Sequence, residues 1–198
     1  MPSLTETKTD CVKPVHLTGT YTYQSPRLDA ITHTLIVMDF VHHEIHDGTY
    51  FFCSDYDSDV DTGAPKYYRF TTPNTTTWGH FNCKYSSSGA GTWQFYENPT
   101  LNAAGTAWST FNANRNSATT AAITAFYDTT TTSDGTLLWT DRTGADGGGL
   151  TRSSGNGSRE EELMLKQNED YILKFTPDAD NAKVIVNCSW YEHVSKTA

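Results

Sequence analysis

Positive charge is scarce in this sequence, and a long apolar run is missing. Only 14 of the 198 residues are Lys or Arg, against 23 Asp and Glu, so the formal net charge is -9. Basic surfaces bind nucleic acids and anionic membranes, so an acidic chain is disfavoured as a partner of either. No stretch approaches the ~20 apolar residues that a membrane helix needs. Residues 1–10 (MPSLTETKTD) lack the apolar core of a signal peptide, so we expect synthesis in a cytoplasm.

Cysteine is also scarce, and it is scattered. The four cysteines are Cys11, Cys53, Cys83 and Cys188, with no CxxC pair among them. That spacing predicts neither a zinc site nor a redox motif. Because a cytoplasm is reducing, buried free thiols are favoured over disulfides.

Motifs of catalysis and of nucleotide binding are missing as well. The sequence has no Gly-x-Ser-x-Gly elbow. The glycine-rich run 144–159 lacks the spacing and the strand–helix context of a nucleotide loop. Such a run suits a loop that lies against a neighbouring subunit, where Arg152 and Arg159 could each bind a carboxylate in bidentate fashion. Arg159 could equally pair with the adjacent Glu160–Glu162. We expect a protein that is not an enzyme and needs no metal or other cofactor.

What the sequence does contain is a series of short alternating segments from Ile31 onward. Tyr171, Leu173 and Phe175 fall on one face of a strand, with Lys174 and Thr176 on the other. Many such runs, separated by turn residues, predict an all-β fold: an antiparallel β-sandwich over residues 31–198, for which a jelly roll is one possible form. The predicted strands are Thr34–Val41, Thr49–Tyr56, Lys66–Thr71, Thr77–Tyr85, Thr92–Tyr96, Ala121–Tyr127, Glu161–Lys166, Tyr171–Thr176 and Lys183–Tyr191. Two long connections, 98–120 and 140–159, are predicted to be functional or ordered by a partner.

Residues 1 to about 30 differ from the rest of the chain. Proline interrupts this segment repeatedly, and little of it is apolar. Leu17, Tyr21 and Tyr23 are spaced by even numbers, so on a strand they form one apolar face that needs a partner. We predict an extended N-terminal arm that contacts a capsid or another subunit through these three residues.

Three residues of the segment His42–Gly48 suggest a metal site. His42, Glu44 and His46 are two apart, so on a strand they would project from one face within reach of one ion. Two histidines and a carboxylate can form such a site. No fourth ligand is evident, and all three residues come from one strand, so hydrogen bonding at a strand end is the favoured interpretation.

A run of alternating aspartates, Asp55, Asp57, Asp59 and Asp61, suggests a calcium loop. The helix-loop-helix form fails, because Val60 and Lys66 stand where its glycine and its glutamate belong. An acidic hairpin end in solvent is favoured.

The five tryptophans and many tyrosines allow two interpretations. Exposed aromatic rings on a β-sandwich can form a platform that stacks on sugars. Aromatic residues also supply most of the buried area in cores and subunit interfaces, and this second interpretation is favoured.

Several segments, read in order, resemble a known family. They are His42–Gly48 (HHEIHDG), Thr72–His80 (TPNTTTWGH), Asn114–Ser117 (NRNS), the glycine-rich stretch that leads to Arg159, Leu165–Asn168 (LKQN) and Trp190–His193 (WYEH). Together they resemble tailed-bacteriophage virion proteins described as capsid decoration or accessory head proteins, over about residues 31–195.

The resemblance implies a non-enzymatic structural protein of the phage head, made in the host bacterial cytoplasm. A decoration (cement) protein binds the major capsid protein and stabilises the assembled head, and a homo-oligomer, with a trimer favoured, is expected. The alternative is a carbohydrate-binding or receptor-binding module associated with the tail. A weaker one is a cupin-type enzyme that uses His42, Glu44 and His46.

Overall fold

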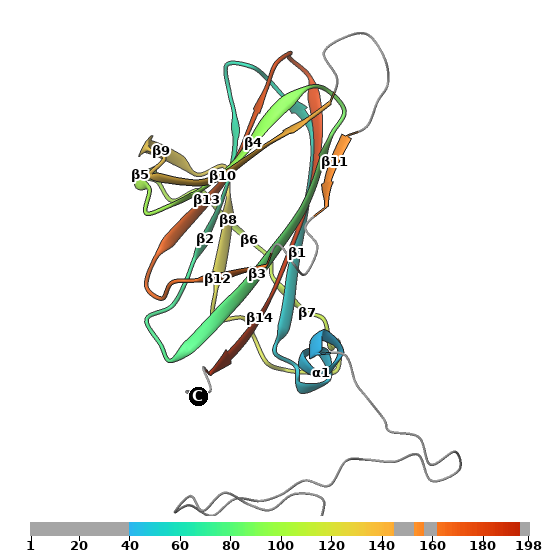
Figure 1. Ribbon diagram of the computed structural model, residues 1–198, viewed down its shortest axis with the longest axis vertical. Coiled ribbons are helices and arrows are strands. Elements are labelled where there is room, and N and C mark those ends of the chain that lie inside the picture. The colour runs from blue at the N-terminus through green and yellow to red at the C-terminus, as the bar shows by residue number, and fades with distance from the viewer. Residues whose placement is uncertain (1–39, 145–152, 157–161, 195–198) are drawn as a thin grey trace, which may run out of the picture. The chain divides into compact units, whose positions relative to one another are not determined.

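The computed structural model describes residues 40–144, 153–156 and 162–194, and for 153–156 only the backbone. The chain divides after Val37, and all described residues belong to the unit that follows. The arm proposed for residues 1–30 and the first part of the predicted strand Thr34–Val41 therefore lie outside the described residues. Figure 1 shows the fold.

Within the described residues, one short helix precedes a succession of strands. They are α1 (Phe40–Asp47), β1 (Tyr50–Val60), β2 (Lys66–Thr71), β3 (Thr77–Ser87), β4 (Gly91–Glu97), β5 (Thr100–Ala103), β6 (Thr106–Trp108), β7 (Phe111–Asn112), β8 (Thr124–Tyr127), β9 (Thr130–Ser133), β10 (Thr136–Thr143), β11 (Ser153–Asn156), β12 (Leu163–Leu165), β13 (Asp170–Pro177) and β14 (Ala182–Val194).

Two antiparallel sheets face each other (Figure 1). The first sheet has the order β11-β3-β14-β1-β7, and β12 also pairs with β3. The second sheet has the order β10-β4-β13-β2-β8-β6, and β5 pairs with β9 in a separate ribbon. The predicted all-β sandwich is thus confirmed.

The strand order of the two sheets is that of a jelly roll. The long strands alternate between the sheets along the chain, so that β1 and β3 lie in the first sheet and β2 and β4 in the second. The four-stranded orders β11-β3-β14-β1 and β10-β4-β13-β2 then arise as they do in an eight-stranded jelly roll. This connectivity places the last strand, β14, between β1 and β3.

Aromatic side chains from both sheets fill the core. Phe81 of β3 stacks on Phe95 of β4, with ring centroids 5.5 Å apart, and contacts Phe70 of β2 at 4.7 Å. Tyr171, Leu173 and Phe175 are all buried, as the alternation predicted, but so is Ile172 on the opposite face of β13. Trp93, Trp108 and Trp190 are buried too, so the favoured core interpretation of the tryptophans is confirmed for these three.

Three cysteines lie in one row of the first sheet. Cys188 of β14 is directly opposite Cys53 of β1 on one side and Cys83 of β3 on the other. All three are buried free thiols, as predicted, whereas Cys11 lies outside the described residues. Burial raises the pKa of the Cys188 thiol, and contact with the other two thiols raises it further, so it stays protonated.

The prediction of a strand through residues 40–41, and of strand geometry for His42–His46, is wrong. Phe40–Asp47 forms α1, and the helix ends at Gly48, whose φ is +73°. The Gly48 amide donates to the Ile45 carbonyl and the Thr49 amide to the Glu44 carbonyl, which is the Schellman pattern of a helix C-terminus. Asp47-Gly48, a pair that often forms a hairpin turn, is therefore a helix cap here.

The prediction that residues 98–120 and 140–159 are long connections is also partly wrong. Residues 98–120 contain the short strands β5, β6 and β7, and residues 140–143 belong to the end of β10. These strands are too short, or alternate too weakly, to show a period of two. The other predicted strands correspond to observed ones, and Lys66–Thr71 coincides with β2.

Replacing Phe95 with Ala tests the layer packing. Phe95 is fully buried between Phe81, Tyr171 and Trp139, so we expect Phe95→Ala to lower the free energy of unfolding by about 3–5 kcal/mol. The matched control is Gln94→Ala on the opposite face of β4, which should cost well under half as much. Urea denaturation measures both, and equal losses would contradict the assigned faces.

Candidate functional site

The outer face of the first sheet, which points away from the second sheet, exposes two cross-strand pairs of large apolar side chains. Phe52 of β1 lies opposite Phe111 of β7, and their rings are 5.8 Å apart. Tyr56 of β1 lies opposite Ile185 of β14. These four residues, here called the apolar patch, are between 37% and 59% exposed. The polar pair Ser54 and Asn187 lies between the two apolar pairs. Large exposed apolar side chains on one face of a sheet can serve as a contact surface.

The motif Asn114–Ser117 lies at one end of the apolar patch and beside α1. The Arg115 guanidinium lies over the Phe111 ring, 5.4 Å from its centroid. The Asn114 side chain donates to the His46 carbonyl, and Ser117 lies so close to Gly48 that a Cβ there would be 2.5 Å from its hydroxyl. Two of the family-like segments, HHEIHDG and NRNS, therefore pack against each other.

A second pair of family-like segments meets at the end of β2. The Thr72 hydroxyl donates to the Lys166 carbonyl at 2.7 Å and accepts from the Glu169 amide at 2.9 Å. The Asn168 amide donates to the Pro73 carbonyl at 3.2 Å. The Thr72 hydroxyl and one backbone hydrogen bond thus join the segments TPNTTTWGH and LKQN, so both segments have a structural role here.

A buried carboxylate explains part of the WYEH segment. Glu192 is 7% exposed, and its side chain points inward from β14. It accepts hydrogen bonds from the amides of Ala122 and Ile123, at 2.9 Å each, and from the indole nitrogen of Trp190 at 2.8 Å. This carboxylate holds the loop before β8 against the first sheet.

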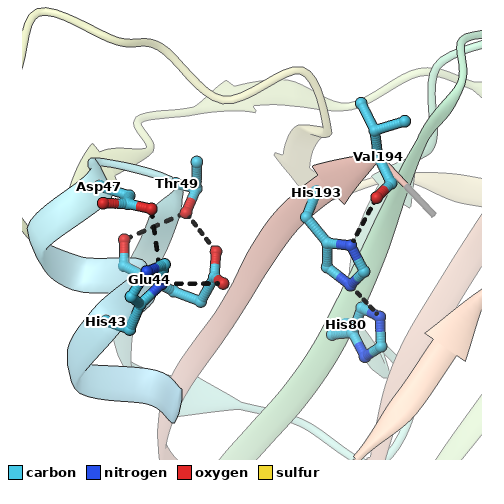
Figure 2. Close-up of polar contacts among 7 residues, drawn as sticks. All are labelled: His43, Glu44, Asp47, Thr49, His80, His193 and Val194. Carbon is cyan, nitrogen blue, oxygen red and sulfur yellow. Dashed lines mark hydrogen bonds and ion pairs between the residues drawn. The ribbon is translucent and has the colours of Figure 1, made fainter. Parts of the chain in front are cut away.

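The proposed ligand set His42, Glu44 and His46 does not come together. On a helix His42 and His46 are one turn apart, and their Nε2 atoms lie 2.9 Å from each other. Glu44 points to another side, where it is buried and contacts the Thr49 hydroxyl (Figure 2). The three-ligand site required residues 42–46 to form a strand, so the structure contradicts that site.

The alternating aspartates have separate structural partners. Asp55 accepts from the Tyr68 hydroxyl, and Asp61 accepts from the Asn181 amide. Asp57 binds Lys66 at 2.8 Å, while the exposed Asp59 donates its backbone amide to Asp57. Their oxygens therefore do not converge as a calcium loop would require.

Lys66 is the centre of a small ion network beside a cavity of about 490 Å³. Its ammonium lies 2.8 Å from Asp57 and 2.7 Å from Asp128. Burial alone would lower the pKa of Lys66, but the hydrogen bonds to the two aspartates outweigh it and raise the pKa. Burial would likewise raise the pKa of Asp57, and the hydrogen bond from Lys66 outweighs it, so that pKa is lowered.

A polar cluster on the outer face of the first sheet was not predicted. Glu162 Oε1 lies 2.6 Å from His80 Nδ1 and accepts a hydrogen bond of 2.6 Å from the Tyr191 hydroxyl. The His80 ring stacks on both Tyr191 and His193. Period-two alternation along WYEH places Tyr191 and His193 on one face, but the partners from β3 and from before β12 become visible only through strand register.

The remaining predicted contact residues, Leu17, Tyr21, Tyr23, Arg152 and Arg159, lie outside the described residues. Among the residues that are described, no group of three or more His, Cys, Asp or Glu side chains could hold a metal ion. In the same part of the chain, no helix is long and apolar enough to cross a membrane.

Comparison of the chain with protein families, with characterised proteins and with solved structures finds no match.

The Asp57–Lys66 pair predicts a pH dependence of stability. Because the pKa of Asp57 is lower in the folded state, its contribution is present above the unfolded pKa of about 3.9 and is lost as pH falls through the folded value. We expect the Asp57→Asn variant to lose less stability than the wild type between about pH 6 and pH 3 in urea denaturation. The matched control, Asp59→Asn, should follow the wild-type curve, and equal slopes for all three proteins would contradict the assignment.

Removing the buried carboxylate should be strongly destabilising. Glu192→Ala leaves two backbone amides and one indole N–H without their acceptor, at about 1–3 kcal/mol for each buried donor that stays unpaired. We expect a loss of at least about 2 kcal/mol by denaturant unfolding. The control is Glu169→Ala, which removes a half-buried carboxylate. If Glu192→Ala lowers the free energy of unfolding no more than Glu169→Ala does, water replaces the Glu192 carboxylate as acceptor.

Proposed function

We propose that this protein is a non-enzymatic structural component of a tailed-phage virion, and that it decorates the capsid by binding the major capsid protein. The observation that supports this most directly is the apolar patch on the outer face of the first sheet. Its four side chains are supplied by three different strands, so a rigid sheet presents them on one face. A rigid, preformed apolar surface suits protein–protein docking, because little side-chain order is lost on binding.

Docking through the apolar patch explains how such a protein would stabilise a head. Burying apolar surface is favourable by roughly 25 cal/mol per Å² removed from water. A subunit that binds only the assembled shell shifts the equilibrium toward that shell by mass action. The net charge of -9 adds attraction toward basic patches of the shell during the encounter.

The fold is compatible with this role by analogy. Jelly rolls occur in viral capsid proteins, but they also occur in lectins and in cupins. The cupin alternative loses its residues, because His42 and His46 lie on α1, and Glu44 binds Thr49. Among these functions the proposal follows the resemblance of the sequence segments to phage head proteins, and a homo-oligomer, with a trimer favoured, is part of it.

A second candidate function is a tail-associated module that binds carbohydrate. One observation favours it: Tyr56 is the most exposed aromatic side chain of the apolar patch, at 59%, and an exposed ring can stack on a sugar. Copy number separates the two functions. Decoration requires many copies for each particle, whereas a tail component is present in few.

Removing the apolar patch should abolish attachment to heads. We expect the Tyr56→Ser/Ile185→Ser double variant to bind purified heads that lack the native protein at least tenfold more weakly than the wild type, measured by co-sedimentation. The control is Leu137→Ser/Leu138→Ser. It likewise removes two exposed apolar side chains, but from β10 in the second sheet. Unchanged occupancy of the patch variant, with circular dichroism showing a folded protein, would overturn the docking face. Binding of the wild type to a glycan array but not to heads would favour the second function.

A further inference from the structure

Two imidazole rings meet nitrogen to nitrogen on the outer face of the first sheet. His80 of β3 and His193 of β14 place their Nε2 atoms 2.9 Å apart (Figure 2). The two residues are far apart in sequence, and the pairing of β3 with β14 brings them together. The rigid sheet, and not a loop, therefore determines their separation.

The other nitrogen of each ring faces an oxygen. His193 Nδ1 lies 3.0 Å from the Val194 carbonyl, which can only accept, so Nδ1 of His193 carries the hydrogen. His80 Nδ1 lies 2.6 Å from the Glu162 carboxylate, an acceptor that favours the same tautomer. With both hydrogens on Nδ1, the Nε2 atom of each ring carries a lone pair, and these are the two atoms that lie 2.9 Å apart.

Two lone pairs at 2.9 Å repel each other unless a cation lies between them. The cation can be a proton or a metal ion. Histidines that bind metals almost always donate their second ring N–H to a carboxylate or to a backbone carbonyl. Glu162 and the Val194 carbonyl are one partner of each kind.

The distance also indicates which metal fits. With metal–nitrogen bonds of about 2.0–2.1 Å, two nitrogens 2.9 Å apart subtend an angle of about 90° at the ion. A tetrahedral ion would need them roughly 3.3–3.4 Å apart at the same bond length. A right angle between two nitrogens belongs to the tetragonal geometry of Cu²⁺ and Ni²⁺, and Cu²⁺ binds nitrogen ligands most tightly among the divalent first-row ions.

We propose that His80 and His193 form a two-imidazole site for Cu²⁺, or more weakly Ni²⁺, in which Glu162 positions His80 and water completes the coordination. Such an ion ties β3 to the end of β14. The proposal does not depend on the proposed virion role, because it rests on side chains outside the apolar patch.

The His42–His46 pair on α1 is an internal comparison. It has the same Nε2–Nε2 distance of 2.9 Å, but it is exposed on one short helix. The side chain of His80 is only 12% exposed, and its ring contacts those of Tyr191 and His193, so it loses less freedom when a metal binds.

Copper titration of the full-length, chelator-treated protein tests the site. We expect one Cu²⁺ per chain by calorimetry near pH 7.5, with Zn²⁺ binding more weakly. His193→Ala should abolish this binding, and Glu162→Gln should weaken it about 10–100-fold. His42→Ala/His46→Ala should leave it unchanged. Paramagnetic Cu²⁺ should broaden the imidazole NMR signals of His80 and His193 before those of the other histidines.

Three results would overturn the proposal. They are the absence of binding tighter than millimolar, retention of the binding in His193→Ala, and its loss in the α1 double variant alone. Should His193→Ala fail to fold, His193→Gln replaces it, because its side chain keeps hydrogen-bonding capacity. Binding that persists in folded His193→Gln at wild-type affinity would likewise exclude the site, and a proton would then be the cation shared by the rings.

Discussion

The pairing of β14 with both β1 and β3 is the constraint on which the rest of this structure depends. From Val184 to Val194, β14 is in continuous register with β3, and β1 flanks its other edge. Since side chains alternate, this one register buries Cys188, Trp190 and Glu192 and turns Ile185 and His193 outward. A slip by a single residue would exchange the two sets. The core, the buried carboxylate, the apolar patch and the imidazole pair are therefore consequences of the same alignment.

The sequence segments on which the proposed phage resemblance rests form internal contacts of the fold. HHEIHDG packs on NRNS at the helix cap, TPNTTTWGH is hydrogen-bonded to LKQN, and WYEH supplies the carboxylate that holds the loop before β8. Most of these contacts specify an architecture. The residues on which the proposed docking rests, Tyr56 and Ile185, lie outside these segments, whereas His80 and His193 are the ends of two of them.

Sequence patterns predict this fold where apolar residues recur at every second position of a strand. Tyr171, Leu173 and Phe175 of β13 have this spacing and are buried, and both β13 and β2 were predicted closely, although Ile172 and Arg69 on their opposite faces are buried as well. α1 was taken for a strand because eight residues are too few to show helical periodicity, and because the Gly48 cap has the same Asp-Gly signature as a hairpin turn. The candidate sites were hardest to predict. His80, Glu162 and His193 meet only through strand register, which no local pattern contains.

Ile185 of the apolar patch and His193 of the imidazole pair lie on the same face but at different ends of β14, whereas Phe52 of the patch lies opposite Ser189, between them. Ile185 and His193 are eight positions apart, which at about 3.3 Å per residue is roughly 26 Å. A partner that covers Tyr56 and Ile185 therefore need not cover the histidines. The acidic charge acts over about 8 Å at physiological salt and governs the approach of a partner, whereas contact with the patch is apolar and little affected by salt. As ionic strength rises, the rate at which this protein associates with heads should therefore fall, while most of its affinity for them is kept.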